Sequence, residues 1–95
     1  METLTTHFGQ GEFTYAQIER EAEFAIYSQT HTASGIIRYE GIRIRIRRSH
    51  TWPNGSTTDE HEAYPSPESW GRDGFTFYTL AAAQAHLHRL AQDKT

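Results

Sequence analysis

The chain has 95 residues and a net charge of -3 at pH 7, so it is long enough for a single domain, residues 1–95, with one modest core. Its 36% hydrophobic and 13% aromatic residues exclude the composition of a disordered chain, and the lack of cysteine excludes a disulfide framework and a thiolate metal site. No apolar run reaches the length of a signal-peptide core or a membrane span, so we expect a soluble, cytoplasmic protein that does not contact membranes.

The first third of the chain is the least regular. Residues 1–13 show no hydrophobic period, and we expect a loosely ordered N-terminus. Residues 14–22 have two interpretations, because Thr14 and Gln17 match a helix capping box, whereas glutamates that alternate with other residues are typical of a strand. The β-rich run from Glu23 to Thr30 predicts a strand.

The most regular stretch runs from Gly35 to His50 and alternates isoleucine with arginine. One side carries Ile42, Ile44 and Ile46, and the other carries Arg43, Arg45 and Arg47. This period of two predicts a strand with one buried and one charged side, joined to the preceding strand as an antiparallel hairpin through a turn at His31–Gly35. The pair Glu40–Gly41 predicts a bulge or a second tight turn inside it.

Residues 50–74 interrupt the period and contain the turn sequence Trp52-Pro53-Asn54-Gly55, so we expect a long loop. Its aromatic residues are Trp52, Tyr64 and Trp70. These rings either fold back as a small satellite core or lie exposed as anchors for a partner.

The last segment predicts a strand at Phe75–Tyr78 and a helix from Leu80 to about Gln92 that is capped by Thr79. The apolar side of the helix consists of Leu80, Ala83, Leu87, Leu90 and Ala91. We therefore predict an α+β fold, in which an antiparallel sheet of three or four strands packs on a C-terminal amphipathic helix, with a long aromatic loop before the last strand. The sheet face under the helix is expected to bear Ile42, Ile44, Ile46, Phe24 and Ile26.

The charges are segregated along the chain. Residues 36–50 contain five arginines and one glutamate, whereas both flanking segments are acidic. The arginine side either is neutralised by a neighbouring strand that carries Glu19, Glu21 and Glu23, or binds an acidic protein, or follows a phosphate backbone. The overall acidity disfavours nucleic acid.

Neither metal binding nor catalysis has a specific motif. His50 and His61 lie near Asp59, Glu60 and Glu62, but their spacing matches no known metal site, and we expect neither a metal nor another cofactor. The chain lacks a nucleophile elbow, a phosphate-binding loop and a dinucleotide fingerprint. We therefore predict that it is not an enzyme and has no catalytic residues.

Four segments together resemble the layout of small uncharacterised proteins of phages and mobile elements: Tyr39–Arg45, Tyr64-Pro65, Trp70–Phe77 and Thr79–Ala83. Some small, acidic, cysteine-poor proteins from that setting are anti-CRISPR inhibitors, which bind an effector complex and commonly lack catalytic motifs. The resemblance implies a non-catalytic inhibitor or adaptor with a protein partner. The alternative is a small nucleic-acid-binding domain that uses the arginine-rich strand.

The predicted partner site combines the aromatic loop with the arginines. Its candidate anchors are Trp52, Tyr64 and Trp70, and Arg43, Arg45 and Arg47 form its electrostatic rim. The oligomeric state has no signature in the sequence.

Overall fold

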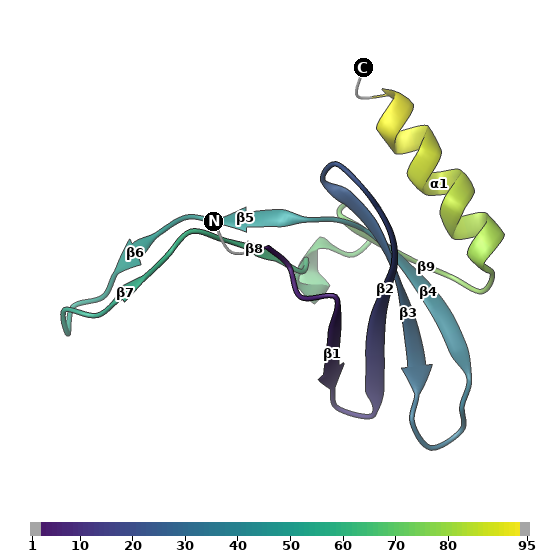
Figure 1. Cartoon of the computed structure of the whole chain (residues 1–95), viewed down its shortest axis with the longest axis horizontal. Coiled ribbons are helices and arrows are strands. Elements are labelled where there is room, and N and C mark those ends of the chain that lie inside the picture. The colour runs from purple at the N-terminus through teal and green to yellow at the C-terminus, as the bar shows by residue number, and fades with distance from the viewer. Residues whose placement is uncertain (1–2, 94–95) are drawn as a thin grey trace.

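A computed structural model describes residues 3–93 as a five-stranded antiparallel sheet with one helix packed on it (Figure 1). The strands are β1 (His7–Gln10), β2 (Phe13–Glu21), β3 (Phe24–His31), β4 (Ile37–Arg43) and β9 (Gly74–Phe77), and the helix is α1 (Leu80–Asp93). Their order across the sheet is β1-β2-β3-β4-β9, so β3 is central. The predicted α+β class is confirmed, and the sheet has five strands rather than three or four because the N-terminal segment contributes β1.

A narrow two-stranded extension leaves the sheet where β4 ends (Figure 1). It is built from two short ladders, in which β5 (Arg45–Arg47) pairs with β8 (His61–Ala63) and β6 (His50–Thr51) pairs with β7 (Thr57–Thr58). We call residues 45–63 the arm. A 3₁₀ helix, η1 (Pro67–Ser69), then leads back to β9. Residues 50–63 of the segment predicted as a loop, residues 50–74, thus belong to the arm. Within the arm, β8 pairs with β5, near the end of the isoleucine–arginine stretch.

The N-terminal third is a β-hairpin. Residues 1–13 are predicted to be loosely ordered, whereas residues 7–10 form the edge strand β1, in which Phe8 pairs with Tyr15 and the two rings stack with centroids 4.5 Å apart. Residues 14–21 belong to β2 and not to a helix, and Ala22 lies in the turn that follows, with a positive φ of 55°. The register of β2 against β3 shifts between Gln17 and Glu19, and the residue between them, Ile18, is exposed.

The bulge predicted at Glu40–Gly41 is absent, because the register of β3 with β4 is unbroken from Phe24–Arg43 to Thr30–Ile37. Gly41 serves packing instead. A Cβ atom at this position would lie 3.1 Å from Cε2 of Phe77, which is tighter than ordinary van der Waals contact. The glycine therefore lets the Phe77 ring lie against the backbone of β4.

Each face of the sheet carries an apolar core. On the helix face, the buried residues are Phe24, Ile26, Ala83 and Leu87, with Tyr39, Phe77, Leu80, Leu90 and Ala91 packed around them. On the opposite face, which we call the aromatic face, the buried residues are Leu4, Tyr15, Ala25, Tyr27, Ile42 and Ile44, with Phe8, Phe13 and Tyr64 around them. Because both faces are covered, four consecutive residues of β3, Phe24 to Tyr27, are buried.

The prediction that the helix covers Ile42, Ile44 and Ile46 is wrong. Residues paired across antiparallel strands point to the same side, and Gly41, not Ile42, pairs with the helix-facing Ile26. Ile42 and Ile44 therefore lie on the aromatic face. Ile46 lies beyond the sheet and is 56% exposed.

The helix forms close to where its sequence places it. The Thr79 hydroxyl accepts a hydrogen bond from the backbone N–H of Ala82 at 3.2 Å, as a capping residue does. Leu80, Ala83, Leu87, Leu90 and Ala91 all contribute to the helix-face core, as predicted. Among the residues that the structure covers, no helix combines the length and the hydropathy needed to cross a membrane.

Candidate functional site

The six residues predicted as a partner site do not form one site. Tyr64 and Trp70 fold back over the sheet, with their rings stacked at a centroid distance of 6.4 Å. Trp52 directly follows β6, near the far end of the arm (Figure 1). The aromatic residues thus divide into a pair that packs on the aromatic face and a single ring at the tip of the arm.

Trp52 is held in place but remains 52% exposed. Its indole N–H donates to Oγ1 of Thr58 at 3.1 Å, and its ring meets the His50 ring edge-on at 4.5 Å. The predicted turn closes beside it, since the N–H of Gly55 donates to the Trp52 carbonyl at 2.9 Å and Gly55 has a positive φ of 89°. The tip is therefore ordered by local bonds alone, with no apolar core beneath it.

Two of the three rim arginines have acidic partners, of which one is a predicted residue and the other is not. Arg43 lies 3.9 Å from Glu23 and over the Phe24 ring, and Arg45 forms a 3.1 Å ion pair with the buried Asp73. Arg47 forms no ion pair with any described residue.

Of the three glutamates predicted to neutralise the arginines, only Glu23 approaches one. Strand β3 lies between β2 and β4, so Glu19 and Glu21 cannot pair with arginines across a ladder. Glu19 instead accepts hydrogen bonds from Gln84 and His88 of the helix, at 3.3 and 3.0 Å.

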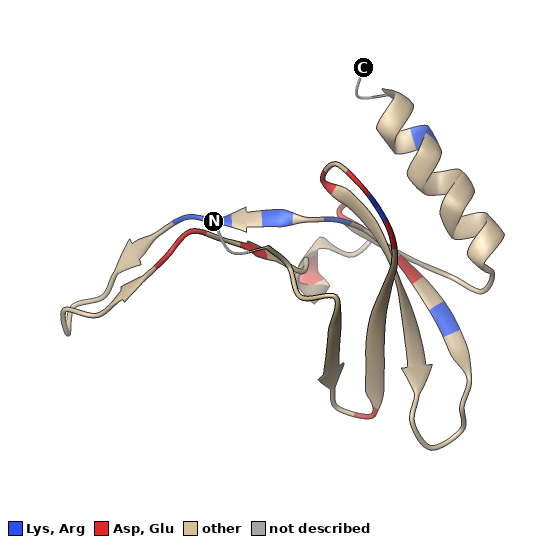
Figure 2. Cartoon of the chain, in the orientation of Figure 1, with Lys and Arg blue, Asp and Glu red and all other residues tan. Residues whose placement is uncertain are grey.

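The arm has basic residues on one strand and acidic residues on the other (Figure 2). The outgoing side carries Arg45, Arg47 and Arg48, and the returning side carries Asp59, Glu60 and Glu62. The formal charges of the arm cancel, so the arm is polarised across its width without being basic as a whole.

The base of the arm is tied to the sheet by Arg20 of β2. Its guanidinium donates two hydrogen bonds to the Glu62 carboxylate, at 2.7 and 2.6 Å, and the backbone N–H of Leu4 donates a third at 2.9 Å. These donors, Arg20 first, lower the pKa of Glu62 to about 2. The anchored part of the arm therefore ends near β8, and the segment beyond it extends without support.

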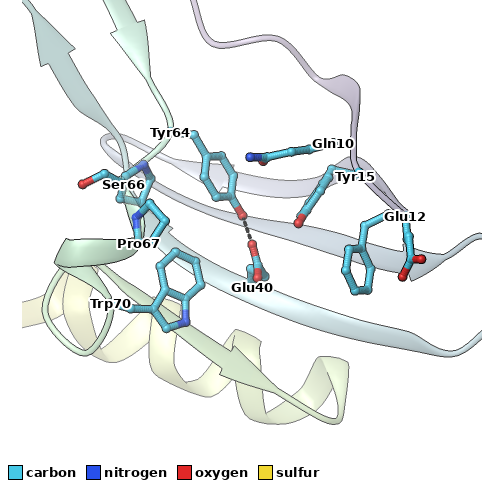
Figure 3. Close-up of a pocket in the computed structure, with 11 residues that line it drawn as sticks. Gln10, Glu12, Tyr15, Glu40, Tyr64, Ser66, Pro67 and Trp70 are labelled. Carbon is cyan, nitrogen blue, oxygen red and sulfur yellow. Dashed lines mark hydrogen bonds between the residues drawn. The ribbon is translucent and has the colours of Figure 1, made fainter.

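A cavity of about 760 Å³ opens on the aromatic face (Figure 3). Its floor is formed by Tyr15 and Glu40, which project from the sheet. One wall is Tyr64 to Pro67 together with Trp70, and the other is the β1–β2 turn from Gln10 to Phe13. We call this space the aromatic cavity.

Two carboxylates line the aromatic cavity, the exposed Glu12 in the β1–β2 turn and the buried Glu40 on its floor. Glu40 is 7% exposed, and its Oε1 accepts a 2.5 Å hydrogen bond from the Tyr64 hydroxyl. Burial raises the pKa of Glu40, against the opposing effect of the Tyr64 hydrogen bond. Burial, followed by the neighbouring carboxylate, also raises the pKa of Tyr64, so this phenol stays protonated and remains a donor.

Replacing Glu40 with glutamine should stabilise the domain at neutral pH. Because the folded state raises the pKa of Glu40 above its ordinary value of 4.5, the favourable contribution of the protonated group is present below that value and lost as the pH rises through the folded pKa. Glutamine keeps an acceptor for Tyr64 without the buried charge. Urea denaturation should give E40Q the higher midpoint at neutral pH, with the difference shrinking in acid. An equal difference at all pH values would contradict this assignment.

The histidines considered as metal ligands have other contacts. His50 lies against Trp52, and Nδ1 of His61 is 2.9 Å from the carbonyl oxygen of Asp59. Among the side chains that the structure describes, residues 3–92, no three histidines or carboxylates come together as a metal site would require.

Two regions are therefore candidate sites: the exposed tip of the arm and the aromatic cavity. The sequence pattern identified Trp52 at the tip and Tyr64 and Trp70 in the cavity. It missed Phe13 and Tyr15 in the cavity lining, and also Glu40 and Arg20, which carry the polar contacts of the cavity and of the arm. Comparison of the chain with known protein families, curated proteins and solved structures finds no match.

Proposed function

We propose that the chain is a non-catalytic protein-binding module, an inhibitor or adaptor acting in the cytoplasm, that engages its partner through the arm. The observation that carries this proposal is the exposure of two large apolar side chains, Ile46 at 56% and Trp52 at 52%, on an element outside both cores. A two-stranded ribbon is marginally stable by itself in water, so an arm of this kind gains most by docking on another surface.

The chemistry of the arm suits a protein partner. Tryptophan is among the residue types that dominate binding energy at protein interfaces, and Trp52 stands at the projecting end. The balanced charges of the two strands match the mixed polarity of a protein surface better than the uniform charge of a phosphate backbone. The resemblance to small phage and mobile-element proteins supports an effector complex as the type of partner.

The test uses two exposed aromatic residues at different places. Tyr78 is 79% exposed and lies on the connection between β9 and α1, away from the arm (Figure 1). Once a partner has been purified from host cells with the tagged protein, W52A should lose about 2 kcal/mol of binding, about thirtyfold in affinity, whereas Y78A should bind as the wild type does. Both variants should keep the wild-type melting temperature, because neither ring belongs to a core.

A different result would remove the arm tip as the site. If W52A binds as tightly as the wild type while Y78A does not, the partner binds near the helix. If W52A lowers the melting temperature sharply and the remaining folded protein binds normally, the ring is structural.

Nucleic acid is a second candidate partner, and one observation supports it. Arg47 and Arg48 lie next to each other on a two-stranded ribbon and form no ion pair with any residue in the described part of the chain, and such ribbons fit the major groove. Two phosphate contacts would give a log–log salt slope of roughly -2. A gel-shift titration with no binding at low salt would eliminate this candidate.

A further inference from the structure

We propose that the aromatic cavity binds an organic cation whose head is an alkylated ammonium group, with the Glu40 carboxylate as its counter-charge. This site lies on the sheet, apart from the arm, and it goes beyond the protein-binding role proposed above.

The charge of the aromatic cavity favours a cation. The lining of the cavity is formed by Gln10, Gly11, Glu12, Phe13, Tyr15, Glu40, Tyr64, Pro65, Ser66, Pro67 and Trp70, and it contains no lysine, arginine or histidine. Glu40 is 93% buried, Oε1 accepts from Tyr64, and Oε2 accepts no hydrogen bond from a described residue. Burying a carboxylate without a cation costs free energy, and a cationic ligand in the cavity would supply the missing partner.

The aromatic lining of the cavity also favours a cation. Four aromatic rings line the cavity, those of Phe13, Tyr15, Tyr64 and Trp70. Figure 3 shows Tyr15, Tyr64 and Trp70 around Glu40. The rings of Tyr64 and Trp70 are nearly parallel, at 21°, whereas those of Tyr15 and Tyr64 are inclined at 63°, so the cavity is bounded by rings in different orientations. A cation over such rings gains about 0.5 to 2 kcal/mol per favourable ring, and most where water is excluded.

The hydrogen-bonding groups of the cavity favour one kind of cation. A guanidinium has five N–H donors and a primary ammonium has three, and each donor must find an acceptor when it is buried. The two phenols are already engaged, since the Tyr15 hydroxyl accepts from Gln29 at 2.9 Å and the Tyr64 hydroxyl donates to Glu40. Apart from Oε2 of Glu40, the floor of the cavity therefore offers aromatic faces rather than unengaged side-chain acceptors, and the other carboxylate of the lining, Glu12, lies in the exposed β1–β2 turn. A quaternary ammonium has no N–H donor and meets this description best. Its head also fits easily within 760 Å³.

The experiment compares choline with 3,3-dimethylbutan-1-ol, a neutral molecule of nearly the same shape. The chain has two tryptophans, so the indole N–H signals in an NMR titration separate the cavity from the arm. Choline should shift the Trp70 signal and leave the Trp52 signal unchanged, and it should bind at least about tenfold more tightly than the alcohol, a difference of about 1.4 kcal/mol. Equal affinities for the two compounds would overturn the proposal, and this comparison needs only the wild-type protein.

A pair of charge-matched variants tests the role of Glu40. E40Q should bind choline about tenfold more weakly while its affinity for the alcohol stays unchanged. The control is E68Q, which removes the same charge from an exposed residue of η1 that does not line the cavity, and it should bind choline as the wild type does. Unaltered choline binding by a folded E40Q, or an equal loss in E68Q, would also overturn the proposal.

The head group could belong to a free small molecule or to a methylated lysine side chain. A peptide that carries trimethyl-lysine, tested beside the same peptide with unmodified lysine, separates the two sources. Tighter binding of the trimethylated peptide than of choline identifies a protein side chain, and tighter binding of choline identifies a small molecule. Tighter binding of the unmodified peptide than of the methylated one contradicts the choice of an alkylated head.

Discussion

Replacing Ile44 with asparagine should destabilise the domain by about 2.5 to 6 kcal/mol, whereas the same replacement at Ile46 should cost at most about 0.5 kcal/mol. Ile44 is 5% exposed in the aromatic-face core, and Ile46 is 56% exposed on the arm. At position 44 the change loses about 1.5 to 3 kcal/mol of apolar burial and adds about 1 to 3 kcal/mol for an unsatisfied amide. The total stability of a small domain is roughly 5 to 15 kcal/mol, so I44N should have a much lower urea midpoint, and a domain near the lower end of this range should unfold.

Urea denaturation followed by circular dichroism measures both variants on the same scale. Asparagine is preferable to aspartate at position 46, because Ile46 pairs with Glu62 across the arm and a second carboxylate there would add repulsion. Equal losses in the two variants would mean that the isoleucine stretch is one continuous buried strand and that the arm does not leave the sheet at Ile44.

This pair of residues shows where the sequence pattern stops being informative. The alternation from Ile42 to Arg47 predicts a strand, and both β4 and β5 are strands, so the prediction of extended structure is confirmed. The alternation cannot reveal that the pairing partner changes from β3 to β8 at Ile44, because a strand has the same period with either partner.

The wrong placement of Ile42 and Ile44 under the helix has a similar origin. The sequence identifies the apolar residues of the helix and of β3, but which of them meet depends on the register between strands. Ile26 pairs with Gly41, so Ile42 is placed beside Ala25, away from the helix. The sequence around Gly41 gives no local signal for this register. The glycine suggests a bulge, but it instead leaves space for the Phe77 ring.

Replacing Gly74 with alanine should destabilise the domain by about 1 to 3 kcal/mol, the usual cost of overpacking. A Cβ atom at this position would lie 2.4 and 2.5 Å from two carbons of the Trp70 ring, so the ring must move. Trp70 is also held by its indole N–H, which donates to Oγ1 of Thr76 at 3.1 Å. Movement of the ring would strain or break this bond and disturb the wall of the aromatic cavity.

A double-mutant cycle tests the steric reason directly. The backbone of Gly74 does not have a positive φ, so alanine is compatible with its conformation. In the W70A background the same change should therefore be neutral, or stabilising by up to about 1 kcal/mol through the lost chain entropy. A cost for G74A that persists without the Trp70 ring would show that the contact is not the cause.

The aromatic cavity was only partly predictable. Tyr64 and Trp70 stand out in the sequence as aromatic residues in a polar segment, and folding back over the sheet was one of the two interpretations considered for them. Glu40 and Tyr15 do not stand out, because a single glutamate and a single tyrosine within strands have no functional spacing. Only the sheet order and the return of the chain after β8 bring these four residues together.

The central claim, that the arm is the partner-binding element, is tested most directly by amide hydrogen exchange of the protein alone and in complex with its purified partner. The amides of residues 48–60, beyond the ladder that Arg20 ties to the sheet, should exchange quickly in the free protein, because this part of the arm packs on neither core, and should become at least about tenfold more protected in the complex. The amides of α1 should exchange at the same rate in both states. Protection gained on α1 or along β1, with the arm unchanged, would contradict the claim.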